Sequence, residues 1–214
     1  MVGKIIPYII MVAVAGLALW RDAPYIVVPL LVFMAASYTI RMLLTDNTVR
    51  GVTEERNAKR ERPLTSAVGI CMVILPLVAL ATPILDFAAY VAFFGQYVLG
   101  AVVGIVGLYC FWRSHADLGS FWSAHLELRE GHALVTTGIY RHMRHPMYTA
   151  IFLITLAQAL LLANWIAGPA GLVTFALLYV TRVQSEEQMM ADSFGDEWHA
   201  YAARTPRLVP RFGS

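Results

Sequence analysis

Residues 87–112 read FAAYVAFFGQYVLGAVVGIVGLYCFW, a run without a single charged side chain. About 20 apolar residues in helical conformation cross the hydrocarbon core of a bilayer. A helix also satisfies its backbone polar groups within the segment, as lipid requires. This run is therefore predicted to span a membrane. Gly100, Gly104 and Gly107 recur within it at helical spacing, and they predict that a neighbouring helix approaches this face closely.

The composition of the whole chain agrees with a membrane protein. Of its 214 residues, 58% are hydrophobic and only 14% are charged, against about 25% charged residues in an ordinary soluble domain. Such a balance excludes a water-soluble enzyme, a disordered chain and a disulfide-stapled secreted domain. The net charge of +2 gives no reason to expect a nucleic acid partner. We interpret Cys71 and Cys110, which lie inside apolar runs, as buried and inert thiols.

Further apolar segments flank the central run on both sides. Together they predict an all-α, polytopic membrane protein with about six transmembrane helices, near residues 5–20, 25–44, 65–85, 87–112, 147–163 and 165–181. The last two are separated by almost nothing and should form a tight hairpin. The first resembles a signal peptide, but no small-residue cleavage site follows it, so we interpret it as a retained helix.

The distribution of Lys and Arg predicts the orientation in the membrane. If the N-terminus is cytosolic, all but one of the 16 Lys and Arg residues fall on the cytosolic side, the exception being Arg21. We therefore expect cytosolic N- and C-termini, in what would be a prokaryotic inner membrane. Both long loops then face the cytosol, where nucleotide-derived cofactors are made.

The two long loops differ in kind. Residues 45–63 mix charges of both signs, and we interpret them as a solvated connector close to lipid headgroups. Residues 113–146 hold five of the six histidines, together with three glycines and one tyrosine, Tyr140. A long segment of this composition between membrane helices is typical of a folded site rather than a tether. The five histidines are His115, His125, His132, His142 and His145.

A metal site is the first alternative for this loop. Asp117 follows His115 by two residues, and His142 and His145 are three apart, which are spacings that zinc ligands can have. No His-Glu-x-x-His or paired Cys-x-x-Cys motif accompanies them, so we expect no metal. The chain also lacks the Gly-x-Ser-x-Gly elbow of serine hydrolases. A membrane subunit that binds a metal or a partner through its His-rich loop remains the alternative that is not an enzyme.

Two later stretches carry the most informative chemistry: GHALVTTGIYRHMRHPMY at 131–148 and RVQSEEQMMADSFG at 182–195. Pro146 suits the first turn of a helix, so backbone N–H groups and Arg144 should lie together there, an arrangement that suits an anion. Arg182 and Glu186 are four residues apart and share a helix face. Gly195 predicts the end of that helix, with a short helix beyond it.

Each of these features has a simpler interpretation when taken alone. Arg182 and Glu186 would form an ordinary surface ion pair, worth a few tenths of a kcal/mol. Tyr140, Tyr148 and Trp198 would belong to an interfacial aromatic belt. Because all of them converge at one membrane face, the set as a whole favours a binding site.

The first stretch resembles the signature of the isoprenylcysteine carboxyl methyltransferase family, in which His-x-Leu-Val-x-x-Gly-x-Tyr precedes Arg-His-Pro-x-Tyr. Residues 182–210, RVQSEEQMMADSFGDEWHAYAARTPRLVP, resemble the same family's tail, with its Arg, paired Glu and closing Pro. The likeness covers about the last hundred residues, whereas the first hundred match only in being membrane helices. The chain is thus similar to a prokaryotic-type member.

This resemblance implies a single integral membrane domain at residues 1–214. Residues 1–112 would hold four N-terminal membrane helices with a cytosolic loop at 45–64, and residues 113–214 would be the catalytic methyltransferase region. A cytosolic loop and a C-terminal helix would cover the active site. The methyl donor would be S-adenosylmethionine and the product S-adenosylhomocysteine. The acceptor would be lipophilic or prenylated and dissolved among membrane lipids.

The resemblance also implies roles for individual residues. Arg182 would bind the substrate, and Arg182, Arg144 and His145 would take part in catalysis. Glu186 would hold the cofactor. The cofactor pocket would be completed by His125, His132, Ala133, Leu134, Val135, Tyr140, His145, Pro146, Met147 and Tyr148. His125 stands where eukaryotic members carry a cofactor-binding Gln.

The acceptor that the resemblance implies is the carboxylate of an isoprenylcysteine. A carboxylate is already ionised at neutral pH, so Arg182 would position it without a general base. An amine or a thiol would need a proton removed, for which His125 or His145 are candidates. A phospholipid N-methyltransferase and a small-thiol S-methyltransferase therefore remain the alternative enzymes.

Overall fold

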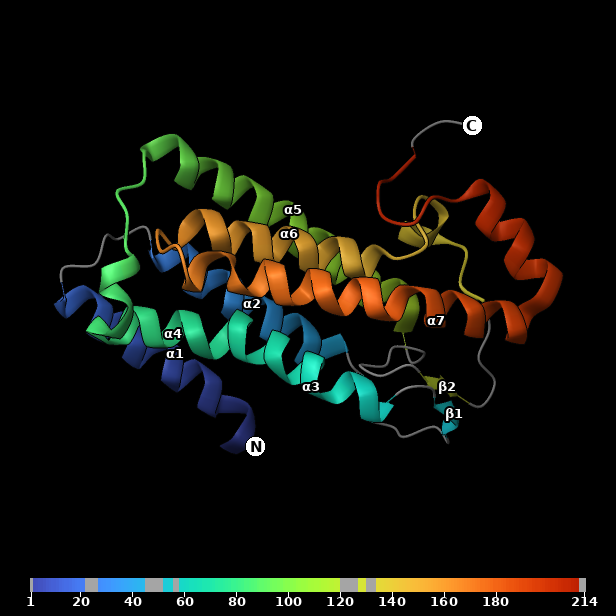
Figure 1. Cartoon of the computed structure of the whole chain (residues 1–214), viewed down its shortest axis with the longest axis horizontal. Helices are drawn as coiled ribbons and strands as arrows, with labels where there is room; N and C mark the ends of the chain where they lie inside the picture. Colours follow the sequence, from blue (N-terminus) through green and yellow to red (C-terminus); the bar gives the residue numbers. More distant parts are fainter. Residues whose placement is uncertain are drawn as a thin grey trace.

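The computed structural model describes residues 2–21, 27–44, 52–55, 58–119, 127–129 and 134–211. Within them the chain is mostly helical, as predicted (Figure 1). The helices are α1 (Val2–Trp20), α2 (Val27–Leu44), α3 (Ala58–Gly69), α4 (Leu75–Ala81), α5 (Phe94–Leu118), α6 (Pro146–Leu161) and α7 (Ala167–Arg204). Shorter turns are the π-helix η1 (Ile70–Ile74) and the 3-10 helices η2 (Pro83–Ala88) and η4 (Gly138–Arg141).

The helices have the character of membrane segments. Glu61–Ala81 and Phe94–Leu118 are long and apolar enough to cross a bilayer, and Lys4–Trp20, Val28–Leu44 and Pro146–Leu161 are apolar but shorter. Large apolar side chains such as Val12 and Ile105 are more than half exposed on the outside of the bundle. Lipid, rather than water, suits such a surface. The number of crossings stays a prediction.

Helix α5 packs closely against two other helices through its glycines, which confirms the prediction for them. A Cβ at Gly104 would lie 2.4 Å from the Phe33 ring of α2, and one at Gly107 would lie 3.1 Å from the Ile154 backbone nitrogen of α6. A side chain at either site would require its neighbour to shift. The glycines therefore allow α2 and α6 to rest directly on α5.

The turn between α6 and α7 is as tight as predicted. The side-chain carbonyl of Asn164 accepts from the backbone N–H groups of Ile166 and Ala167, at 3.0 and 2.9 Å. Its amide donates to the Leu85 carbonyl at 2.7 Å. Asn164 thus satisfies the first N–H groups of α7, which have no partner inside the helix.

The apolar pattern predicted a helix that begins near residue 65. In the structure, the helix formed by α3, η1 and α4 begins earlier, at Ala58. It contains a π-helical turn just before Pro76, which has no N–H to donate and displaces the preceding turn. The buried amide of Gln158 on α6 donates to the Cys71 carbonyl in this turn, at 3.1 Å. The loop predicted at 45–63 therefore includes the start of a packed helix.

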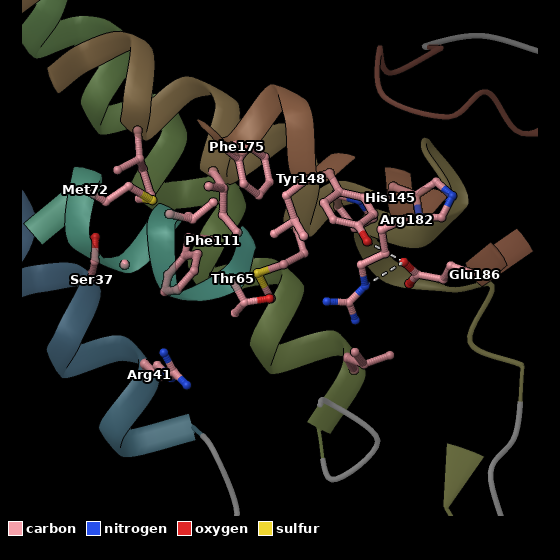
Figure 2. Close-up of a pocket in the computed structure, with 18 of the residues that line it drawn as sticks. Ser37, Arg41, Thr65, Met72, Phe111, His145, Tyr148, Phe175, Arg182 and Glu186 are labelled. Atoms are coloured by element: carbon pink, nitrogen blue, oxygen red, sulfur yellow. Dashed lines mark hydrogen bonds and ion pairs between the residues drawn. The ribbon is translucent and has the colours of Figure 1, made fainter. Parts of the chain in front are cut away.

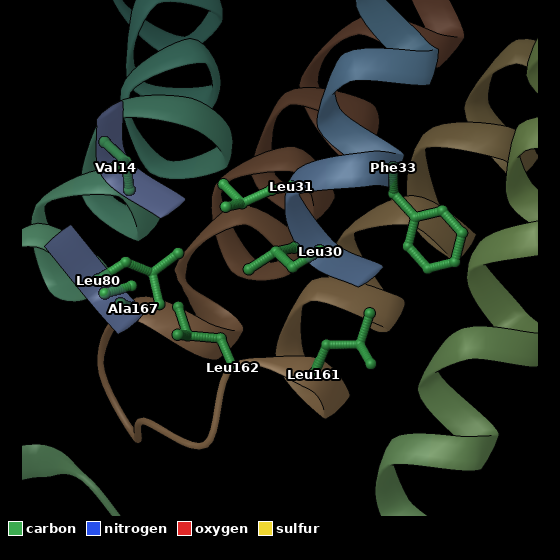
Figure 3. Close-up of a cluster of buried hydrophobic side chains, with 9 residues drawn as sticks. Val14, Leu30, Leu31, Phe33, Leu80, Leu161, Leu162 and Ala167 are labelled. Atoms are coloured by element: carbon green, nitrogen blue, oxygen red, sulfur yellow. The ribbon is translucent and has the colours of Figure 1, made fainter. Parts of the chain in front are cut away.

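The two ends of the bundle are built differently. At one end an apolar core closes the gap between helices (Figure 3). Its members are Val14, Ala18, Leu30, Leu31, Phe33, Leu80, Leu161, Leu162 and Ala167. At the opposite end, β1 (Val52–Glu55) pairs antiparallel with β2 (Glu127–Arg129), so the two loops meet. Figure 1 shows the C-terminal segment folded back at this same end.

Candidate active site

A cavity of about 640 Å³ lies inside the bundle. Its inner part is apolar, with side chains such as Met11, Phe33 and Met72 from the N-terminal helices. Its outer part carries Arg182 and Glu186, near the end that holds the loops (Figure 2). A volume in the range of about 300–1,000 Å³ is typical of sites that enclose a small organic molecule. The same cavity thus has an apolar inner part and a charged outer part.

Three residues form what we call the cavity cluster: Tyr148, Arg182 and Glu186. The Tyr148 hydroxyl donates to Glu186 Oε2 at 2.5 Å, and Arg182 Nε lies 3.8 Å from the same oxygen. Tyr148 stands in the first turns of α6, and the other two share one face of α7. Arg182 is only 8% exposed. It is therefore a buried group facing a cavity, and the interpretation as a surface ion pair is wrong.

Glu61 extends this cluster from α3. Its Oε2 lies 3.6 Å from Arg182 Nε, and the residue is only 4% exposed. Glu61 was expected in a solvated connector, which is wrong for this residue. In the structure it lies four residues before the cavity-lining Thr65 and shares its helix face.

A second group, which we call the latch cluster, consists of Arg144, His145, Glu187 and Arg207. Glu187 accepts from the Arg144 guanidinium at 2.9 Å, from His145 Nε2 at 3.1 Å and from the Arg207 guanidinium at 2.7 Å. Burial alone would raise the pKa of Glu187, but these hydrogen bonds outweigh it and hold the pKa well below its ordinary value. Glu187 is the second Glu of the pair in the tail motif, and no role was predicted for it.

The latch cluster fixes the C-terminal segment, residues 205–211, over the start of α6. The backbone N–H groups of Arg144 and His145 donate to the Pro206 and Arg207 carbonyls, at 2.8 and 2.9 Å. The Arg144 guanidinium also donates to the Ala202 carbonyl at 2.7 Å. The expected anion site is therefore wrong for these N–H groups and for this guanidinium, because the protein's own oxygens occupy them.

Gly195 ends the straight part of α7, as predicted. Its φ of +52° lies in the left-handed region that favours glycine, and the chain turns there into a short helical segment. Trp198 and Tyr201 in that segment are buried and line the cavity. The Tyr201 hydroxyl donates to the Tyr140 carbonyl at 2.6 Å. The end of α7 and the loop before α6 thus form one roof.

Asp117 and His115, two of the candidate metal ligands, have structural partners. Asp117 Oδ2 accepts from the Ile139 backbone N–H at 2.8 Å, and His115 Nδ1 lies 2.9 Å from the Phe111 carbonyl. Gly138 has a φ of +60°, and a Cβ there would lie 2.2 Å from Asp117. Among the residues that the structure describes, no three His, Cys, Asp or Glu side chains gather as metal ligands do.

Most of the residues predicted for the site lie around this one cavity. They are Leu134, Val135, Tyr140, Arg144, His145, Pro146, Met147, Tyr148, Arg182 and Glu186. His125, His132 and Ala133 lie outside the described residues. Sequence reasoning missed the contribution of the N-terminal helices, for instance Ser37 and Arg41 of α2. It also missed Met189 and Met190, which follow Glu186 and Glu187 on α7 and line the cavity.

The chain resembles proteins of known type. A model of the isoprenylcysteine carboxyl methyltransferase (ICMT) family matches residues 97–192. A protein-S-isoprenylcysteine O-methyltransferase of Schizosaccharomyces pombe is 32% identical over 37% of this chain and 34% of its own length. Protein-S-isoprenylcysteine O-methyltransferase B of Arabidopsis thaliana is 35% identical over 38% of this chain and 41% of its own length.

A relative with a different name matches a longer stretch. The nickel-cobalt-cadmium resistance protein NccN of Alcaligenes xylosoxydans xylosoxydans is 31% identical over 51% of this chain and 49% of its own length. This chain therefore spans between about a third and a half of the curated relatives described here.

The fold also has a counterpart among solved structures. The eukaryotic intramembrane Ras methyltransferase ICMT superimposes with a TM-score of 0.58 at 19% identity, over 94% of this chain and 73% of that one. At this identity the likeness concerns the fold alone. It extends to the N-terminal helices, which the sequence resemblance did not reach. Together, the family match and the fold agree with the resemblance seen in the motifs: residues 97–192 of this integral membrane protein match the isoprenylcysteine carboxyl methyltransferase family, and the helices have the fold of the solved ICMT.

Proposed function

We propose that this protein transfers a methyl group from S-adenosylmethionine to a lipophilic acceptor, the carboxylate of an isoprenylcysteine. The observation that carries the proposal is a single cavity with an apolar interior and the buried cavity cluster at its outer part. The family of residues 97–192 supports the same reaction. The reaction would take place at the cytosolic face, which the distribution of Lys and Arg favours.

The outer part of the cavity has the chemistry that S-adenosylmethionine needs. Glu186 offers carboxylate oxygens to an amine or to ribose hydroxyls, and Tyr148 holds that carboxylate in place. Trp198 and Tyr201 add aromatic surface under the roof. Leu134 and Val135, which belong to no helix or strand, also line the cavity. When bound, the cofactor supplies an electrophilic methyl group on its sulfonium.

The acceptor carboxylate would lie on Arg182. A guanidinium binds a carboxylate in two parallel hydrogen bonds, so it fixes both the position and the direction of the oxygen that attacks. Methyl transfer is an in-line displacement, and the protein contributes mainly alignment and the exclusion of water. The carboxylate is ionised before it binds, so none of these residues has to remove a proton.

The acceptor tail would occupy the apolar part of the cavity. Met11 and Met34 come from α1 and α2, Met72 from η1, and Phe175 from α7. Methionine side chains adapt to irregular apolar shapes, which suits a branched isoprenoid. Apart from Phe175, these side chains come from helices that the sequence motifs do not cover.

Arg144 and His145 would contribute indirectly. Both are bonded to Glu187, and the backbone of each holds the C-terminal segment. We assign them the role of keeping the roof closed over the cavity. A direct part in methyl transfer, which the resemblance implied for them, stays a prediction.

A labelling experiment tests the proposed function. Membranes that contain the protein are incubated with methyl-labelled S-adenosylmethionine and N-acetyl-S-farnesylcysteine, with Arg182→Ala membranes as the matched control. A methyl ester releases labelled methanol on treatment with base, and this release is the expected result. Label that is stable to base would contradict carboxylate methylation and indicate an N- or S-methyltransferase. A parallel incubation with phosphatidylethanolamine in place of the farnesylcysteine tests the alternative of a phospholipid N-methyltransferase.

Calorimetry tests the alternative that is not an enzyme. The purified protein is titrated with S-adenosylhomocysteine and, separately, with zinc. The proposed function requires micromolar binding of S-adenosylhomocysteine that Glu186→Ala weakens. Binding of zinc alone would support a metal-binding subunit, a possibility to which the name of the NccN relative also draws attention.

A further inference from the structure

The buried carboxylate of Glu61 has no part in the function proposed so far. It comes from α3, in the half of the chain that the family match does not cover. Its oxygen lies 3.6 Å from Arg182 Nε, nearer than the 3.8 Å that separates Nε from Glu186. A carboxylate that is only 4% exposed carries a large desolvation cost unless a cation lies beside it. The pairing with Arg182 is therefore important to both residues.

The two carboxylates lie near the same atom of Arg182. Both contacts are to Nε, and Figure 2 shows the terminal nitrogens of Arg182 directed away from Glu186. In that view they point toward Thr65, one turn beyond Glu61 on α3 and itself part of the cavity wall. Both carboxylates thus lie at ion-pair distance from the Nε edge of the guanidinium, and in Figure 2 its terminal nitrogens extend toward the cavity wall.

We infer that Glu61 is a positioning residue that orients the Arg182 guanidinium toward the acceptor carboxylate. Glu186 cannot do this alone, because it also binds Tyr148 and is the residue proposed to hold the cofactor. Glu61 stands outside that interaction and holds Arg182 whether or not the cofactor is bound. The inference rests on the proposed function, and it adds a residue from the N-terminal half to the reacting end of the cavity.

The negative charge of Glu61 predicts how its removal changes KM and kcat. Glu61 repels an acceptor carboxylate, so Glu61→Gln should leave KM for the acceptor unchanged or lower it. The same change releases the Arg182 guanidinium from one side, so the bound carboxylate is less well aligned and kcat should fall about tenfold. The affinity for S-adenosylhomocysteine should stay within about twofold. A residue needed only for folding would not lower kcat while KM and the affinity for S-adenosylhomocysteine stay nearly unchanged.

A double-mutant cycle makes the test specific to Arg182. In an Arg182→Ala background, Glu61→Gln should lower kcat less than twofold further, since the group that it positions is gone. Arg62→Gln is the matched control, because Arg62 is the exposed neighbour on the same helix. Full additivity of the two substitutions, an unchanged kcat in Glu61→Gln, or an equal loss of cofactor affinity would each overturn the inference.

A spectroscopic measurement tests the contact without turnover. The ¹⁵N signal of Arg182 Nε is assigned by its loss in Arg182→Lys, and it should shift in Glu61→Gln but not in Arg62→Gln. An unchanged signal would overturn the inference. If the wild-type protein methylates no acceptor while this signal shifts, the proposed function fails and the positional contact stands. If the wild type is active and the signal does not move, only the role of Glu61 fails.

Discussion

Two adjacent residues of α7, Glu186 and Glu187, belong to two different regions of the molecule. Glu186 faces the cavity and bonds to Tyr148, whereas Glu187 faces the C-terminal segment and bonds to Arg144, His145 and Arg207. One residue of separation turns a helical side chain by about 100°. A single helix turn can therefore serve the chemistry on one face and hold the roof on the other. If this division is right, substitutions in the two clusters should have different signatures.

The largest effect is expected at Arg182 in the cavity cluster. Arg182→Ala should lower kcat by about 10²- to 10³-fold, because the acceptor carboxylate loses its charged partner. The Kd for S-adenosylhomocysteine should change less than twofold. Steady-state kinetics with the farnesylcysteine analogue, together with calorimetry, measure the two quantities. A fall in cofactor affinity as large as the fall in kcat would undo the separate roles of Arg182 and Glu186.

The second effect concerns the cofactor. Glu186→Ala should weaken binding of S-adenosylhomocysteine at least about tenfold, since a charge-assisted acceptor is lost from the outer part of the cavity. Glu187→Ala is the matched comparison, because it removes the same group one residue later. Calorimetry on both variants checks the difference. Equal losses of affinity would show that the two carboxylates do not have distinct roles.

The latch cluster should respond mainly in stability and in its pH dependence. Glu187→Gln should cost about 1–3 kcal/mol at pH 7, because three donors lose their ionised acceptor. The folded protein holds the pKa of Glu187 below its ordinary value of 4.5, so this stabilisation is complete above that pH and is lost as the pH falls.

The thermal midpoint, followed by tryptophan fluorescence from pH 7 to pH 3, checks the latch prediction. The midpoint of Glu187→Gln should lie below that of the wild type at pH 7, and the two should converge in acid. A difference that stays constant with pH would contradict the role of the ionised carboxylate.

The smallest effect is expected at the apolar part of the cavity. A Cβ at Gly104 displaces the Phe33 ring, which lines the space proposed for the acceptor tail. Gly104→Ala should raise KM for the farnesylated acceptor about two- to fivefold, on the order of 0.5–1 kcal/mol, while the cofactor Kd is unchanged. Gly16→Ala is the control, since a Cβ there meets nothing within 4 Å. An equal change of KM in both variants would contradict this assignment of the cavity.

The difference between the cavity cluster and the latch cluster also explains which structural features could be predicted from the sequence. Local patterns were sufficient for the helical fold, the hairpin at Asn164, the close contacts of Gly104 and the turn at Gly195. These features depend on nearest neighbours along the chain or on one helix face. The recurring motif residues Tyr148, Arg182 and Glu186 could be placed together because the family resemblance covers them.

The remaining features depend on contacts between distant segments. Glu61 lies in a highly charged stretch, and no local pattern distinguishes it from its solvated neighbours until α3 is packed against α7. The partners of Glu187 come from the start of α6 and from the C-terminal segment, which no helical spacing connects. The same holds for the expected anion site at Arg144, because only the folded chain brings the Pro206 carbonyl to its N–H group.

The most direct test is an experimental structure with S-adenosylhomocysteine and N-acetyl-S-farnesylcysteine bound together. We predict the cofactor product against Glu186 beneath Trp198, the acceptor carboxylate on the terminal nitrogens of Arg182, and the farnesyl chain toward Phe33. Binding of the cofactor product outside this cavity, or of the acceptor with its carboxylate away from Arg182, would contradict the account.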